Sequence, residues 1–120
     1  MLWTELTSER FPEAVKQAGG LCLLPFGVIE RHGPHLPLGT DQIDADAVAK
    51  AAAEVEPAVV FPSYYFGKIF TARHYAGTIA LTRKLLLPLL EAVCDEIARN
   101  GFKKIPVSYT HLTLPTNREV

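Results

Sequence analysis

The chain is 120 residues long, which is enough for one compact domain with a hydrophobic core and too short for two. Its 12 basic and 13 acidic side chains are scattered and give a net charge of −1, so we expect neither nucleic acid nor an anionic membrane surface as a partner. The longest apolar stretches, residues 21–26 and 85–90, are far shorter than the roughly 20 residues that span a membrane. The N-terminus lacks the features of a signal peptide, so we expect a cytoplasmic protein.

The first predicted elements are a short helix and a buried strand. Thr7 or Ser8 can cap a helix that runs to about Ala18, and the Gly-Gly pair at 19–20 ends it. Residues 21–26 form a continuous apolar run, as expected of a strand that is covered on both faces. The two cysteines, Cys22 and Cys94, lie inside apolar patterns, and we interpret both as small buried hydrophobic residues.

The next predicted elements are an alanine-rich helix and a second short strand. The helix begins at Asp41 or Asp44 and extends to about Glu54, and acidic residues in its first turn suit the helix dipole. Residues 58–61 form the strand, which Pro62 ends. The pattern predicts an apolar stripe along the helix that consists of Ile43, Ala47, Val48, Ala51 and Val55.

The second half of the chain predicts a loop, a long helix and a third strand. Residues 62–81 form a long loop or hairpin, and residues 102–107 begin the strand. Pro88 should kink the intervening helix or delay its start. Because strands and helices alternate, we expect an α/β fold with a mainly parallel sheet. The helix spans about residues 82–100, with an apolar stripe of Leu86, Leu89, Leu90, Val93 and Ile97.

The segment after the first strand carries the clearest chemistry. Glu30 and His32 are two residues apart, so in extended backbone both side chains point to the same side. Asp41 follows at the start of a helix, and its carboxylate can bind one ion or bridge two. Carboxylate oxygen and imidazole nitrogen are ligands for Zn, Mn or Fe. Sites in open parallel sheets form at the carboxyl ends of strands, which is where this segment lies.

The same residues also admit a purely structural interpretation. Glu30 can be a surface carboxylate, His32 and His35 can be ordinary loop residues, and Asp41 can be a helix N-cap. The spacing E-x-H with a later Asp is a weak pattern, so spacing alone leaves both interpretations open.

The run L-P-F-G-V-I-E-R-H-G-P-H-L-P-L-G-T-D at residues 24–41 resembles the signature of the creatininase family of metal-dependent amidohydrolases. A second block, H-Y-A-G-T-I-A-L at residues 74–81, resembles another family motif, and the likeness extends from about residue 3 to residue 105. It implies a three-layer α/β/α fold, two divalent ions (Zn, Mn or Fe) in each site, and a homo-oligomer. The implied reaction is hydrolysis of a C–N bond in a small-molecule amide by metal-bound hydroxide.

The resemblance also implies roles for single residues. Glu30 would ligate the first ion, His32 the second, and Asp41 would bridge them. His35 would shape the loop or support a ligand. His74 is a candidate pocket residue, although a packing role is equally open.

The chain departs from the family pattern after Ile105. The family continues with a strand and a motif close to N-G-H-G-G-N, which supplies further ligands, whereas residues 106–120 resemble a translated adaptor tail. His111 falls in register with a family ligand but lacks the flanking glycines, so we favour coincidence. We therefore expect residues 1–105 to be the N-terminal part of a truncated creatininase-like domain, and the chain to be poorly soluble or inactive by itself.

Two further functions stay open. The first is another reaction of the same family, namely a formamide deformylase or a peptidase that matures a cofactor peptide. The second is a non-catalytic metal-binding or interaction domain that is complete at this length. In-frame genomic DNA that continues beyond codon 105 into a G-H-G-G-N-like motif would favour the enzyme.

Overall fold

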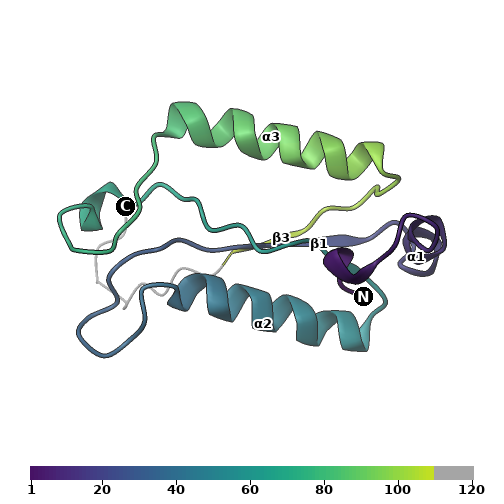
Figure 1. Ribbon diagram of the computed structural model, residues 1–120, viewed down its shortest axis with the longest axis horizontal. Coiled ribbons are helices and arrows are strands. Elements are labelled where there is room, and N and C mark those ends of the chain that lie inside the picture. Colours follow the sequence, from purple (N-terminus) through teal and green to yellow (C-terminus); the bar gives the residue numbers. More distant parts are fainter. Residues whose placement is uncertain (110–120) are drawn as a thin grey trace, which may run out of the picture.

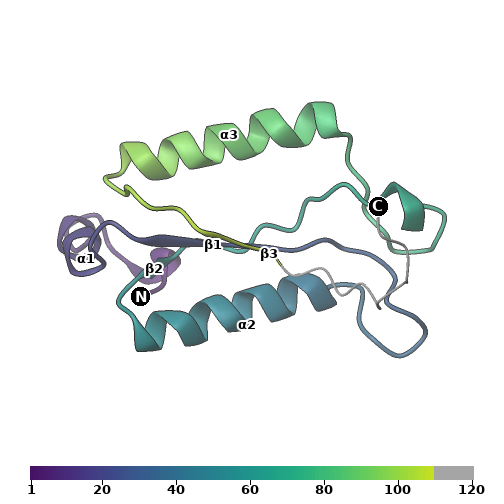
Figure 2. The ribbon, with the colours of Figure 1, turned by 180° about the vertical axis from the view of Figure 1, so that it is seen from behind.

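A parallel three-stranded sheet lies between two long helices in the computed structural model, which describes residues 1–109 (Figures 1 and 2). The central strand β1 (Cys22–Phe26) pairs in parallel with β2 (Val59–Val60) on one side and with β3 (Val107–Tyr109) on the other. Helix α2 (Thr40–Val55) covers one face of the sheet and α3 (Arg83–Arg99) covers the opposite face. The expected three-layer α/β/α fold with a parallel sheet is therefore confirmed.

Shorter elements surround this frame. Helix α1 (Phe11–Gln17) starts later than Thr7 or Ser8, because residues 8–10 form a turn instead. Gly19 and Gly20 end it with φ angles of 56° and 71°, in the left-handed region that glycine tolerates. Two single-turn 3-10 helices, η1 (Trp3–Glu5) and η2 (Phe70–Ala72), complete the described elements.

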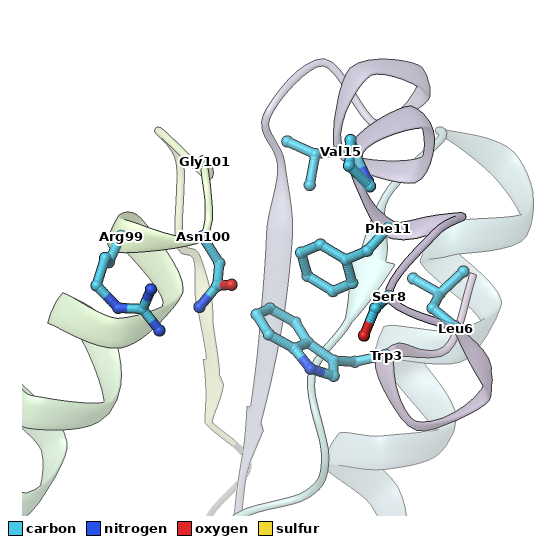
Figure 3. Close-up of a pocket in the computed structure, with 9 residues that line it drawn as sticks. Trp3, Leu6, Ser8, Phe11, Val15, Arg99, Asn100 and Gly101 are labelled. Atoms are coloured by element: carbon cyan, nitrogen blue, oxygen red, sulfur yellow. The ribbon is translucent and has the colours of Figure 1, made fainter.

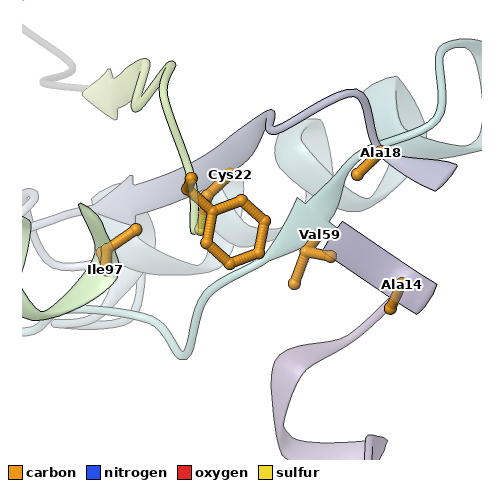
Figure 4. Close-up of a cluster of buried hydrophobic side chains, with 6 residues drawn as sticks. Ala14, Ala18, Cys22, Val59 and Ile97 are labelled. Carbon is orange, nitrogen blue, oxygen red and sulfur yellow. The ribbon is translucent and has the colours of Figure 1, made fainter. Parts of the chain in front are cut away.

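The core lies mainly between the sheet and α3. Cys22 and Leu24 alternate along β1 and both face this layer. Ile97 packs in the cluster around Cys22 (Figure 4), and Leu86 packs with Leu24. Leu89 is 36% exposed, although the sequence pattern placed it in the buried stripe. The remaining buried members of the cluster around Cys22 are Ala14, Ala18, Val59 and Phe102.

The predicted apolar stripe of α2 is wrong. Ile43, Val48 and Val55 are 53%, 55% and 86% exposed. The residues that face the sheet are instead Thr40, Asp41, Ala45 and Ala49. The reason is that α2 lies very close to the end of β1. A Cβ at Gly27 would collide with the backbone of Gln42, so only small side chains fit between the helix and β1.

Pro88 does not delay α3, which begins at Arg83 and includes Pro88 in its second turn. The carbonyl that loses its helical hydrogen bond belongs to Lys84, which is exposed and accessible to water. The third strand begins at Val107 rather than 102, after an isolated bridge between Leu21 and Lys104. No helix among residues 1–109 combines the length and the apolar character that crossing a membrane requires.

The carbonyl of Pro106 accepts a hydrogen bond from the N–H of Leu24 at 3.0 Å, so this proline contributes an acceptor to the sheet. Residues 107–109 then pair with β1. The proposed boundary between a domain at 1–105 and a tail at 106–120 stays a prediction. His111 lies outside the described residues.

Candidate metal centre

The segment that follows β1 folds back toward the start of α2 as a set of short turns. The N–H of Glu30 donates to the carbonyl of Leu38, and Ile79 donates to Ile29 from the neighbouring loop. A tight turn joins His32 to Leu36, and Gly33 adopts a φ of 72° within it. The loop therefore has a defined, non-helical shape, as is typical of a segment that contains proline and glycine.

This shape brings Glu30, His32 and Asp41 together. One ligand atom from each residue can be chosen so that all lie within 4.8 Å of one another. Nε2 of His32 lies 3.0 Å from Oδ1 of Asp41 and 3.8 Å from Oε1 of Glu30. The sequence predicted this grouping from the i, i+2 spacing and from the position of Asp41 at a helix start.

The cluster is almost entirely shielded from solvent. Asp41 is fully buried and Glu30 is 6% exposed. Asp41 is the second residue of α2 and the N-cap is Gly39, so the alternative in which Asp41 caps the helix is excluded. Buried carboxylates need partners, and the first turn of a helix supplies a favourable dipole for them.

Gly27 fixes the position of Asp41 and was not singled out by the sequence analysis. A Cβ built on Gly27 would overlap the backbone of Gln42 and would lie 2.7 Å from the carbonyl carbon of Asp41. The absence of a side chain at residue 27 therefore lets the first turn of α2 sit against the end of β1. A glycine directly after a predicted strand and before a ligand segment is the signal that identifies such a residue.

The hydrogen bonds of His32 define its protonation. Nδ1 lies 3.0 Å from the carbonyl oxygen of Glu30 and Nε2 lies 3.0 Å from Asp41, and both oxygens can only accept. Burial acts to lower the pKa of His32, but the Glu30 carbonyl, the hydrogen bond to Asp41 and the charges of both carboxylates outweigh it and raise the pKa. If Nε2 were to bind an ion, the hydrogen bond from Nδ1–H to the carbonyl of Glu30 would keep the ring in orientation.

The donor set fits a divalent metal. Ligand atoms bound to one ion at about 2.0–2.2 Å lie roughly 3–4 Å apart, which is the range seen between His32 and its two carboxylate neighbours. Mixed imidazole and carboxylate ligands suit Zn, Mn or Fe. Glu30, His32 and Asp41 would hold such an ion.

The other predicted histidines lie outside this cluster. His35 is exposed, and its ring lies beside Gly33 at the tip of the turn. His74 is also exposed and packs on Tyr75, with ring centroids 4.0 Å apart. The guanidinium of Arg31 lies 4.3 Å from the centre of the same tyrosine ring. His74 therefore belongs to a surface stack beside the metal loop, which is the segment of residues 27–39 between β1 and α2. Its role as a pocket residue stays a prediction.

A cavity of about 760 Å³ lies at the opposite end of β1, near α1 and the C-terminal end of α3 (Figure 3). Trp3 and Phe11 line one side of it, and Arg99 and Asn100 line the other. The metal loop follows the carboxyl end of β1, whereas this cavity lies at its amino end. The cavity is therefore separate from the candidate centre.

Known proteins match this chain over most of its length. The family model for creatininase, described as creatinine amidohydrolase, matches residues 4–118. Creatinine amidohydrolase of Pseudomonas putida is 29% identical over 112 residues, which cover 89% of this chain and 43% of that protein. The mycofactocin precursor peptide peptidase of Mycolicibacterium smegmatis is 38% identical over 78 residues, or 59% of this chain and 32% of that protein.

Solved structures give the same relationship. A structure described as "Creatininase Mn" has a TM-score of 0.81 and 28% identity, over 88% of this chain and 43% of that one. A mutant creatininase of "Zn-Zn type" has a TM-score of 0.80 and 29% identity over the same shares. This chain thus spans less than half the length of these relatives. With the family model matched along nearly the whole chain, and with the fold shared, the chain belongs to the creatininase family.

Proposed function

We propose that the chain carries the metal-binding half-site of an amidohydrolase that cleaves the C–N bond of a small-molecule amide. The observation that supports this most directly is the convergence of two buried carboxylates, Glu30 and Asp41, with the partly buried His32, from a loop and a helix start. The named relatives act on creatinine or on a precursor peptide, and the bond in both kinds of compound is an amide.

The bound ions would be two divalent cations, with Mn or Zn favoured by the descriptions of the related structures. Such ions supply Lewis acidity, which polarises a carbonyl group and activates water for attack. The chain's own residues would hold these ions in place, because Asp41 is fixed by the first turn of α2 and His32 is fixed by the carbonyl of Glu30. The buried carboxylates of Glu30 and Asp41 also balance the positive charge in a region of low polarity.

A second candidate function is peptide cleavage, as in the maturation of a cofactor peptide. Identity to the precursor peptide peptidases reaches 38%, against 29% for creatinine amidohydrolase, although over a shorter part of the chain. A formamide deformylase is a further alternative in the same reaction class, and a non-catalytic metal-binding domain is the alternative from another class.

The proposed partners follow from the same reasoning. We propose a small amide substrate and a homo-oligomeric enzyme, located in the cytoplasm. A net charge of −1 with dispersed basic residues gives no electrostatic attraction for nucleic acid or for anionic membranes.

Titration calorimetry of the 120-residue chain with MnCl₂ or ZnCl₂ tests the half-site. Wild type should bind metal in a fixed stoichiometry, and Glu30→Gln should weaken binding by more than the roughly 10–100-fold that loss of a supporting contact costs. Glu54→Gln, which changes an exposed carboxylate near the end of α2, is the matched control and should bind as wild type does. Equal affinities for all three chains contradict the proposal.

A hybrid enzyme distinguishes the two reactions. Residues 4–105 of this chain would replace the matching part of the Pseudomonas putida creatinine amidohydrolase. Hydrolysis of creatinine by the metal-loaded hybrid supports the first candidate, and cleavage of a short peptide supports the second. A soluble hybrid that holds metal and cleaves neither compound rules out both.

A further inference from the structure

The side chain of Thr78 presents an unexplained polar atom next to the metal loop. Its hydroxyl oxygen is buried and has no hydrogen-bond partner among residues 1–109. Buried polar groups are almost always hydrogen-bonded, and an unpartnered hydroxyl costs roughly 1–3 kcal/mol. Tyr64 carries a second such hydroxyl, but that ring packs in the apolar cluster with Leu24 and Leu86.

The register of the neighbouring loop places Thr78 opposite a ligand. Ile79 and Ile29 form an antiparallel bridge, with the N–H of Ile79 donating to the carbonyl of Ile29 at 2.9 Å. One step along this pairing sets Thr78 across from Glu30. Directly opposed residues of an antiparallel pair project from the same face and have Cβ atoms about 4.5–5.5 Å apart.

A neighbouring contact supports the same placement. A Cβ at Gly77 would collide with the side chain of Leu38, whose carbonyl accepts the N–H of Glu30. Gly77 also has a φ of 84°, so a turn that requires glycine delivers Thr78 to this position. The loop of residues 77–79 is therefore packed directly against the backbone that carries the first ligand.

We propose that Thr78 is a binding residue of the candidate metal centre. Its hydroxyl hydrogen-bonds an oxygen atom of the molecule held beside Glu30. This inference rests on the proposed metal function. The oxygen belongs to a water molecule or to the carboxyl product of amide cleavage. A threonine hydroxyl can donate one hydrogen bond and accept others, so it suits either source.

The proposal predicts that loss of the Thr78 hydroxyl weakens binding by the metal-loaded chain and does not destabilise the metal-free chain. Thr78→Val keeps the shape of the side chain and removes only the hydroxyl. Because that hydroxyl has no partner in the described part of the chain, the thermal midpoint of the metal-free variant should equal or exceed that of wild type. A hydroxyl with a merely structural role would instead lower the midpoint whether or not metal is bound.

The test uses MnCl₂ as the metal probe and acetate as the carboxylate probe, both followed by calorimetry on the 120-residue chain. If the oxygen belongs to water, Thr78→Val should weaken Mn²⁺ binding by about tenfold, the size typical of a lost supporting contact. If it belongs to a product carboxylate, Mn²⁺ affinity is retained and the affinity of the metal-loaded chain for acetate falls by a similar factor. Thr78→Ser, which keeps the hydroxyl, should bind like wild type in both titrations.

Thr71→Val in η2 removes an exposed hydroxyl of the same loop and is the matched control. The inference is overturned if Thr78→Val binds Mn²⁺ and acetate as wild type does, or if it lowers the midpoint of the metal-free chain. A wild-type chain that binds no Mn²⁺ overturns the proposed metal function itself, and this inference falls with it.

Discussion

At the scale of single residues, burial sets the chemistry of the side chains around β1. Cys22 is fully buried in the core, and burial raises the pKa of its thiol to about 12. Cys94 on α3 is half-buried, and burial raises its pKa as well. The thiolate is the nucleophilic form, so neither cysteine is suited to catalysis at neutral pH, in agreement with the interpretation from sequence.

A thiol titration tests this account of Cys22. In a Cys94→Ser variant at pH 8, the folded chain should show no thiol that reacts with Ellman's reagent, and one should appear after denaturation. The reason is that Cys22 is both shielded and protonated in the folded state. Rapid reaction of one thiol in the folded variant would contradict the placement of this residue.

At the scale of elements, the candidate metal centre depends on how closely α2 approaches β1. Gly27→Ala adds a methyl group where the backbone of Gln42 already lies, so α2 must shift and carry Asp41 with it. We expect a loss of about 1–3 kcal/mol in the free energy of unfolding, together with weaker metal binding. Chemical denaturation and metal titration measure the two effects.

Gly39→Ala is the matched control for this prediction. A Cβ at Gly39 meets only the side-chain ends of Ile29 and Ile43, at 3.8 and 3.9 Å. This variant should therefore retain metal affinity and lose less stability than Gly27→Ala, because its only cost is a poorer helix N-cap. Equal behaviour of the two alanine variants would show that the approach at Gly27 does not position Asp41.

A polar link also ties α2 to the segment after β2. Asp46 accepts a hydrogen bond from Ser63 at 2.7 Å and pairs with Lys50. Burial acts to raise the pKa of Asp46, but the contacts with Lys50 and Ser63 outweigh it and lower the pKa. A lowered folded-state pKa means that the link stabilises the fold above the usual pKa of the aspartate, and that this contribution is lost as the pH falls through the folded-state value.

Asp46→Asn should accordingly destabilise the chain by about 0.5–1 kcal/mol at pH 7, because the pair with Lys50 is partly exposed and screened. The difference from wild type should shrink as the pH falls below the usual pKa of an aspartate, about 3.9, and vanish below the lower folded-state pKa, where the carboxylate is protonated. Urea denaturation at several pH values measures it. A difference that persists at low pH would mean that the carboxylate charge is not the stabilising feature.

At the scale of the whole molecule, the sequence predicted which elements form and where the candidate ligands lie. The apolar run of β1 and the E-x-H spacing act locally, so they can be read from neighbouring residues. The face of α2 that packs against the sheet could not be predicted in this way. Hydrophobicity favours Ile43 and Val48, whereas packing against the strand selects Ala45 and Ala49, because the available space depends on Gly27 in a distant segment.

The outer helix faces carry large exposed apolar side chains. Ile43, Val48 and Val55 lie on α2, and Leu85 and Leu87 lie on α3. Exposed patches of this kind promote association, which agrees with the expected poor solubility of the chain. Replacing Ile43, Val48 and Val55 by lysine should lower light scattering without changing the thermal midpoint, whereas Ala49→Lys on the buried face should unfold the chain. Unchanged scattering in the triple variant would contradict this explanation.

The proposed metal centre consists of one loop and the start of one helix. Its most direct test is the Mn²⁺ or Zn²⁺ content of the purified Asp41→Asn chain, with Asp44→Asn on the exposed side of the same helix turn as the control. We predict a fixed metal stoichiometry in wild type and in Asp44→Asn, and loss of metal from Asp41→Asn while the fold is retained by circular dichroism. Full metal content in a folded Asp41→Asn chain would contradict the account.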